Sequence, residues 1–136
     1  MQRPLKLLAF TMAALSLTAA VLVTGCAPPE AALYDKIKKD YAEIYGGNAD
    51  ELTLRVYGNY NEAVALKVFG PWDVAAVVSE VSVGEYIFEW ETYRPIYIYY
   101  KDTFYDLENA YQNEFLSEAD LCDLYVAYER NEYQEY

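Results

Sequence analysis

The sequence predicts an α+β domain with an N-terminal helix, a four- to five-stranded antiparallel meander, and two short C-terminal helices packed on one sheet face. Three observations predict it. Apolar residues recur at helical spacing over residues 33–45, and they alternate with polar residues through much of 53–101. After residue 106 the helical spacing returns, with a helix-capping signal at Ser117.

The first helix is expected over residues 33–45. Its apolar residues fall on one face at three- and four-residue spacing: Tyr34, Ile37, Tyr41 and Ile44. Gly46 and Gly47 provide the stop signal. The prolines at 28 and 29 favour an extended tether before it.

The strands are expected to follow in chain order. Alternation over 53–57 and 63–68 predicts a hairpin with its turn at 58–61, and 81–90 and 96–101 predict further strands, the former bent at Gly84. Residues 74–78 fit either a helical turn or a strand. One face of the meander is apolar and the other is rich in Tyr and charge, which is typical of a sheet covered by helices on one side only.

The C-terminal third is expected to form two helices. Asp106 can cap the first, and Ser117 with Asp120 forms a capping-box pattern for the second. The domain is expected to span residues 33–130. Residues 131–136 are polar, and we expect a frayed tail there.

The N-terminus has the pattern of a secretory leader, with Arg3 and Lys6 ahead of an apolar run over 7–23. The motif Val23-Thr24-Gly25-Cys26 resembles the lipobox of bacterial lipoproteins. The resemblance implies that residues 1–25 are a signal peptide and that Cys26 is the acylated first residue of the mature chain. Residues 26–32 would then be the anchor and tether, and several acyl chains would hold the protein at the extracytoplasmic side of the cell membrane.

A second resemblance concerns the C-terminal part. Residues 98–107, 110–111 and 115–121 are similar to the C-terminal signature of small extracytoplasmic domains of Gram-positive bacteria, a group with no assigned activity. The resemblance implies fold and location only. Thr103 and Glu114 stand where that group usually has Gly, which raises the question of whether these turns use positive φ.

Charge narrows the possible partners. The chain carries a formal charge of −12, and loss of Arg3 and Lys6 with the leader would leave −12 − 2 = −14. Such a surface repels nucleic acid, so none is expected as a partner. With Cys26 acylated, Cys122 would be the one remaining thiol and no intrachain disulfide could form.

The residue types argue against catalysis. The sequence contains no His to activate a nucleophile or to bind zinc, and it has no calcium-loop pattern. Glu89 and Glu91 share a strand face at a spacing that glycosidases use, but that spacing is common. We therefore expect no enzyme, no catalytic residue, no metal site and no cofactor.

The surplus of aromatic residues favours binding, since 16 Tyr follow residue 33. The leading hypothesis is a non-catalytic domain that binds a protein partner near the membrane through the Tyr-rich sheet face or the meander's edge. The alternative is a module that binds cell-wall glycan, and an inhibitor or immunity factor is a third option without a motif. The candidate binding residues are Tyr60, Trp90, Tyr93, Tyr97 and Tyr99.

Overall fold

The computed structural model describes residues 29–136. The expected signal peptide, the acylated Cys26 and the first part of the tether lie outside the described residues. The chain divides into two units, Met1–Ala32 and Leu33–Tyr136, and the fold below is that of the second unit. Among the helices of the described part, none is both long and apolar enough to cross a membrane.

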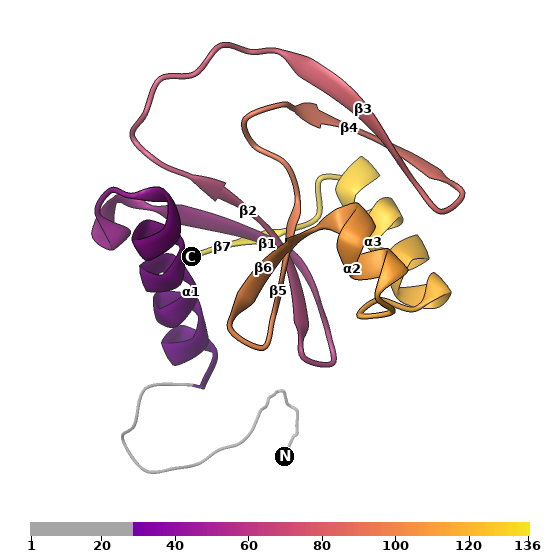
Figure 1. The fold of residues 1–136 in the computed structure, drawn as a ribbon, viewed down its shortest axis with the longest axis horizontal. Coiled ribbons are helices and arrows are strands. Elements are labelled where there is room, and N and C mark those ends of the chain that lie inside the picture. Colours follow the sequence, from indigo (N-terminus) through magenta and orange to yellow (C-terminus); the bar gives the residue numbers. More distant parts are fainter. Residues whose placement is uncertain (1–28) are drawn as a thin grey trace, which may run out of the picture. The chain divides into compact units, whose positions relative to one another are not determined.

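An N-terminal helix precedes six antiparallel strands, and two helices and a short last strand follow them (Figure 1). Along the chain the elements are α1 (Pro29–Tyr45), a 3-10 turn η1 (Ala49–Glu51), β1 (Thr53–Tyr60), β2 (Ala63–Phe69), β3 (Val78–Val83), β4 (Tyr86–Glu91), β5 (Tyr97–Tyr100), β6 (Thr103–Asp106), α2 (Leu107–Gln112), α3 (Glu118–Glu129) and β7 (Gln134–Glu135). The predicted α+β class, with its N-terminal helix and two short C-terminal helices, is confirmed.

The strands do not form one continuous meander. Five of them make a sheet in the order β6-β5-β2-β1-β7, while β3 and β4 pair only with each other. Residues 70–77 carry the chain out of the sheet in neither helix nor strand, so β2 takes β5 as its neighbour instead of β3. The single bent strand expected over 81–90 is instead a hairpin. Its two-residue turn places Gly84 at φ 58°, a conformation that favours Gly.

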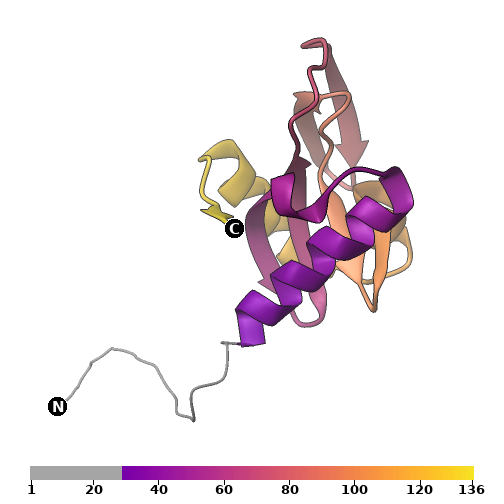
Figure 2. The ribbon, with the colours of Figure 1, turned by 90° about the vertical axis from the view of Figure 1, so that its left-hand side faces the viewer.

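Both faces of the five-stranded sheet are covered, which corrects the expectation of one open face. α1 lies across one face, and α2, α3 and the β3–β4 hairpin lie against the other (Figures 1 and 2). The sequence signal for two buried faces is in β2: Val64, Leu66 and Val68 face α1, and Ala63 and Ala65 face the core on the other side of the sheet. Alanines on the second face let the covering layer approach closely, so their presence marks a buried face and not a solvated one.

The turns and caps follow the local sequence. The capping box is confirmed, because the Asp120 amide donates to Ser117 Oγ at 3.1 Å and the Ser117 amide donates to Asp120 Oδ2 at 3.3 Å. Asp106 caps α2 as predicted. Thr103 lies in β6, and the left-handed positions of that turn are Lys101 and Asp102.

Glu114 ends α2 with φ 65°. The Phe115 amide donates to the Ala110 carbonyl at 2.9 Å and the Glu114 amide donates to the Tyr111 carbonyl at 3.1 Å. This is a Schellman cap in which Glu occupies the position that Gly prefers.

Two boundaries differ from the sequence prediction. β1 continues through Gly58 to Tyr60, so the turn lies at Asn61 and Glu62 and not over 58–61. The C-terminal residues do not fray, because β7 pairs with β1. The amides and carbonyls of Leu54 and Tyr136 exchange two hydrogen bonds of 3.0 Å, which ties the polar tail into the sheet edge.

One lysine is buried in the layer beneath α3. Lys67 is 8% exposed, its Nζ donates to Tyr128 Oη at 2.8 Å, and that hydroxyl donates to the Glu89 carbonyl at 2.9 Å. Burial is the main reason that the pKa of Lys67 falls to about 8, with Glu91 opposing the fall and Arg55 and Arg94 assisting it.

Candidate functional site

The five residues singled out from sequence do not share a surface. Tyr97 and Tyr99 belong to the core on the α1 side of the sheet, whereas Tyr60 and Trp90 belong to the core on the opposite side. Of the five, only Tyr93 is largely exposed, at 58%. The proposed Tyr-rich sheet face is therefore not available in that form.

The cause on the first face is α1. Tyr99 is 3% exposed, and its hydroxyl donates to the Asp40 carboxylate and accepts a hydrogen bond from Lys36 Nζ at 3.0 Å. Burial, with that carboxylate next, raises the pKa of Tyr99 to about 12. Tyr97 is half-buried, and its ring centroid lies 6.2 Å from that of Tyr41 on α1. Both tyrosines hold α1 on the sheet.

On the other face, packing explains the remaining two residues. Trp90 is 8% exposed, with its ring centroid 5.8 Å from Phe88 and 6.3 Å from Tyr128. Tyr60 is half-buried beside Gly58, where an added Cβ would lie 2.2 Å from the Tyr60 hydroxyl. Burial raises the pKa of Tyr60 to about 12.

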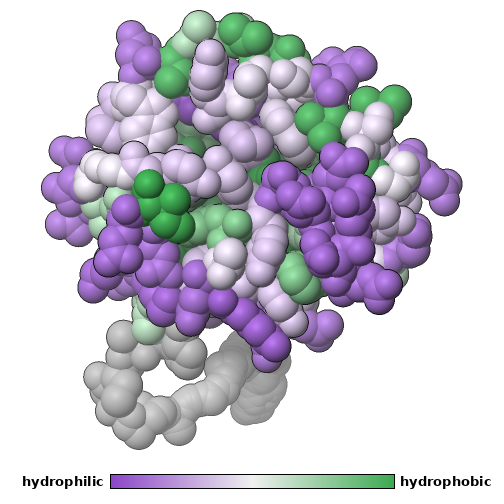
Figure 3. Space-filling view, in the orientation of Figure 1, coloured by the Kyte–Doolittle hydropathy of each residue, from purple (hydrophilic) through white to green (hydrophobic). Residues whose placement is uncertain are grey.

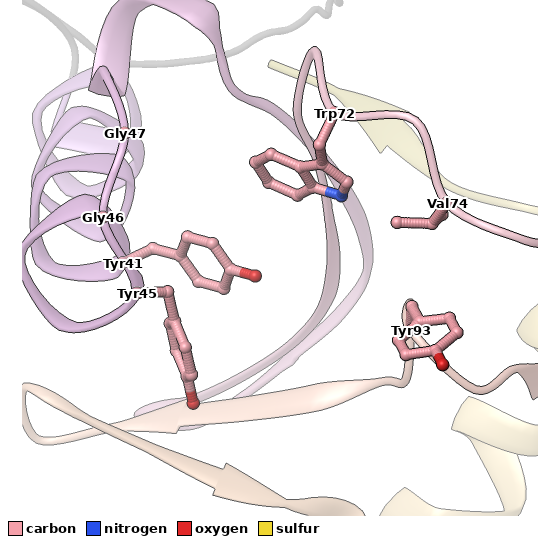
Figure 4. A pocket seen from close by; sticks show the side chains of 7 residues that line it. All are labelled: Tyr41, Tyr45, Gly46, Gly47, Trp72, Val74 and Tyr93. Atoms are coloured by element: carbon pink, nitrogen blue, oxygen red, sulfur yellow. The ribbon is translucent and has the colours of Figure 1, made fainter.

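Tyr93 instead belongs to an open aromatic pocket of about 440 Å³. Three segments contribute to it: the end of α1, the irregular stretch after β2, and the turn between β4 and β5 (Figure 4). We call it the aromatic pocket, and its lining residues are Tyr41, Tyr45, Gly46, Gly47, Trp72, Val74 and Tyr93.

The end of α1 supplies one wall. Tyr41 and Tyr45 are four residues apart and so lie on the same face of the helix, with ring centroids 4.5 Å apart. Gly46 and Gly47 follow at φ 91° and 100°, which stops the helix as predicted. Because the helix ends here, the Tyr45 ring stays 54% exposed.

Trp72 extends this wall from the stretch after β2. Its ring is nearly parallel to that of Tyr41, with an interplanar angle of 17° and centroids 6.4 Å apart. The indole lies directly on Gly70, where an added Cβ would come within 1.8 Å of the ring. Gly70 is therefore required for the observed position of Trp72.

The β4–β5 turn places Tyr93 across the pocket. The Thr92 amide donates to the Val77 carbonyl at 2.6 Å, and the Arg94 amide donates to the Glu91 carbonyl at 2.8 Å. Bonds on both sides of Tyr93 thus fix its backbone. Figure 4 shows its ring facing Tyr41 and Trp72 from the other side of the opening.

Three exposed apolar residues, Ile44, Val77 and Val78, adjoin the lining of the aromatic pocket, and we call them its apolar rim. Seven large apolar side chains are exposed in residues 29–136, and two of them, Tyr45 and Tyr93, line the pocket. Ile44 precedes Tyr45 in the chain, the Val77 carbonyl accepts a hydrogen bond from the amide of Thr92, next to Tyr93, and Val78 follows Val77. Figure 3 shows apolar surface gathered over the segment that joins β2 to β3. The other two, Ile87 and Val126, lie elsewhere.

The lining of the pocket is aromatic and uncharged. It has no carboxylate, amine, thiol or serine hydroxyl, and burial raises the pKa of the Tyr41 phenol, which therefore stays protonated at neutral pH. Its polar groups are the tyrosine hydroxyls, the Trp72 indole N–H and the backbone at Gly46 and Gly47, of which the Gly46 amide already donates to the Ala42 carbonyl. Within residues 29–136, no three His, Cys, Asp or Glu side chains are placed to hold a metal ion.

Sequence reasoning missed most of this site. The prediction that Tyr41 lies on the buried face of the helix is confirmed, since Tyr41 is 8% exposed, but Tyr45, Trp72 and Val74 were not predicted as site residues. A Tyr pair at i and i+4 before Gly-Gly is a visible signal for an aromatic face at a helix end. Known proteins offer no guide, since no family model, curated protein or solved structure matches this chain significantly. The site must be interpreted from its own residues.

Proposed function

We propose that this chain is a lipid-anchored, extracytoplasmic binding domain without catalytic activity, and that the aromatic pocket and its apolar rim bind a protein partner. The observation that carries the proposal is the concentration of exposed apolar side chains at one pocket. Exposed apolar patches with polar surroundings mark interaction sites, and Tyr and Trp are enriched among the residues that contribute most to binding.

The position of the pocket suits a partner beyond the membrane surface. The chain enters the folded unit at Leu33, and Tyr45 lies about 18 Å further along the same helix at 1.5 Å per residue. An anchor on Cys26 would restrain the start of α1, whereas the pocket lies at its other end. The partner would therefore bind from the side away from the anchored end of the helix.

Crosslinking on intact cells tests the proposal. Tyr93→Ala should abolish capture of a defined protein, whereas Ile87→Ala should leave capture unchanged. Ile87 is the matched control because it is 57% exposed, as against 58% for Tyr93, and lies near the other end of β4. Equal capture by both variants would remove the pocket from the proposal.

Glycan binding is the second candidate, favoured by the indole of Trp72 and the exposed ring of Tyr45, which both lie against Tyr41. Sugar rings stack on such faces, and tyrosine hydroxyls can bond their hydroxyl groups. Retention of the purified domain on peptidoglycan, lost in Trp72→Ala and with no captured protein, would favour this alternative.

The anchor is tested separately. Mass spectrometry of the native protein should find a mature N-terminus at Cys26 carrying acyl chains. An unmodified Cys26 would overturn the proposed location and leave the pocket untouched.

A further inference from the structure

We infer that the aromatic pocket receives a positively charged side chain, Arg or Lys, from a basic segment of the protein partner. This inference rests on the proposed function and specifies the chemistry of the same site. It follows from the lining of the pocket, from the charge around it, and from how the chain uses its own cations.

The lining offers aromatic faces on both sides of the opening. Tyr41, Tyr45 and Trp72 form one wall and Tyr93 stands across from them (Figure 4). The face of an aromatic ring carries negative charge density, so a ring attracts a cation that lies within about 6 Å of its centroid. A cation held between the two walls would contact more than one face.

The electrostatic environment favours a cation. No charged residue lines the pocket. Four acids lie within two residues of the lining in the chain: Asp40 and Glu91 are paired with Lys36 and Arg94, whereas Glu43 and Asp73 form no ion pair within residues 29–136. The sequence carries a formal charge of −12, so a basic segment is attracted from a distance.

The positive groups near the lining residues in sequence lie at other sites. Arg94 follows Tyr93, but its Nη1 donates to Glu91 Oε1 at 3.1 Å and its guanidinium lies 4.8 Å from the centroid of Phe69. Lys36 on α1 bonds Asp40 and Asp102 at 2.7 and 3.0 Å. Lys38 and Lys39, which are closer to Tyr41 in the chain, line a different pocket with Asp35 and Asp50. None of these cations lines the aromatic pocket.

The rest of the domain pairs cations with ring faces repeatedly. Arg55 lies over Phe69 and Tyr133 at 4.3 and 4.7 Å, and Lys67 lies over Tyr128 at 4.9 Å. Lys101 lies 5.3 Å from the centroid of Tyr100. In the described part of the chain, by contrast, no cation lies over any of the four rings of the pocket. Tyr41 is 8% exposed and Trp72 is half-buried, so the faces open to a cation from outside are chiefly those of Tyr45 and Tyr93.

The test uses two small probes that differ in charge and hardly in shape: N-acetyl-arginine-N-methylamide and its neutral citrulline counterpart. Titration of the folded domain should shift the NMR signals of Trp72 and Tyr93 with the arginine probe. We expect the citrulline probe to bind at least about fivefold more weakly, the ratio that 1 kcal/mol of cation–π attraction gives.

Two variants distinguish binding to an aromatic ring face from binding to apolar surface in general. Tyr93→Leu keeps an apolar side chain but removes the ring, and it should weaken the arginine probe while leaving the citrulline probe unchanged; Ile87→Ala should alter neither. Equal affinity for both probes, or stronger binding of N-acetylglucosamine than of arginine, would overturn the inference. If a protein is still captured on cells in that case, the proposed function stands and only the cation is wrong.

Discussion

The domain contains two aromatic clusters that differ in what covers them. The closed cluster consists of Tyr57, Phe88, Trp90 and Tyr128, and the open cluster consists of Tyr41, Tyr45, Trp72 and Tyr93. Phe88 is fully buried and Trp90 is 8% exposed. In the open cluster Tyr41 is equally buried, but Tyr45 and Tyr93 are more than half exposed. Both clusters are built from aromatic rings, so aromatic content does not distinguish a core from a site.

The difference lies in where the covering elements end. The closed cluster is sealed because the β3–β4 hairpin and α3 both reach it. The open cluster lies where α1 stops at Gly46 and the chain after β2 has no regular structure. Exposed apolar residues that gather at one place on a surface are a common mark of interaction sites.

Substitution in the closed cluster should have the largest effect on stability. Phe88→Ala removes a fully buried ring and should lower the free energy of unfolding by about 3–5 kcal/mol. Urea unfolding followed by circular dichroism measures this loss. A loss of less than about 1 kcal/mol would mean that the closed cluster is not the core described above.

The buried lysine of the closed side should make stability depend on pH. The folded-state pKa of Lys67 is about 8 and an unfolded lysine titrates near 10.4, so between these values the unfolded chain binds more protons. Stability should therefore rise by roughly 1–2 kcal/mol from pH 7.5 to 9.5. It should fall above pH 10, because burial raises the pKa values of Tyr60 and Tyr97 in the fold.

Lys67→Met is the control for that pH profile. Tyr128 keeps its bond to the Glu89 carbonyl in this variant, and an apolar residue replaces a buried charge. The rise below pH 9.5 should disappear in urea titrations at several pH values. A rise that persists would assign the effect to another group.

A substitution that relieves an unfavourable backbone conformation outside both clusters should change the free energy of unfolding less than the substitutions above. Glu114→Gly relieves a left-handed residue at an exposed helix end and should raise the free energy of unfolding by about 0.5–1 kcal/mol. Glu108→Gly, within α2, should lower it by a similar amount. Opposite shifts in the urea midpoint for the two variants would confirm that Glu114 has a left-handed conformation at the end of α2, and shifts of the same sign would contradict it.

The open cluster should contribute least to stability. Tyr93→Ala removes a mostly exposed ring, so the free energy of unfolding should change by less than about 0.5 kcal/mol. Thermal unfolding of this variant beside Phe88→Ala measures the contrast directly. A large loss for Tyr93→Ala would identify the open cluster as a structural core.

Periodicity and capping were enough to predict the helices and the fold class. The capping box at Ser117 and the Gly46–Gly47 stop depend on a few neighbouring residues, which is why they could be read from sequence. The covering of the second sheet face could not be predicted from sequence, because it depends on where α1 docks. Tyr97 and Tyr99 give the same sequence pattern whether solvent or a helix covers them.

The site was the least predictable part. Of the candidate binding residues, Tyr93 is the one that is largely exposed, and its neighbours in the pocket come from residues 41–47 and 72–74. The Tyr41–Trp72 ring contact and the hydrogen bond from Thr92 to Val77 bring these segments together. Such a pocket depends on contacts between distant segments, for which local periodicity carries no signal.

The most direct test of the account is photocrosslinking on living cells with a benzophenone amino acid at a single position. Placed at Tyr93 or Tyr45, it should crosslink one defined protein, and placed at the equally exposed Ile87 it should not. Crosslinking from Ile87 alone, or equally from all three positions, would contradict the claim that the open aromatic cluster is the binding site.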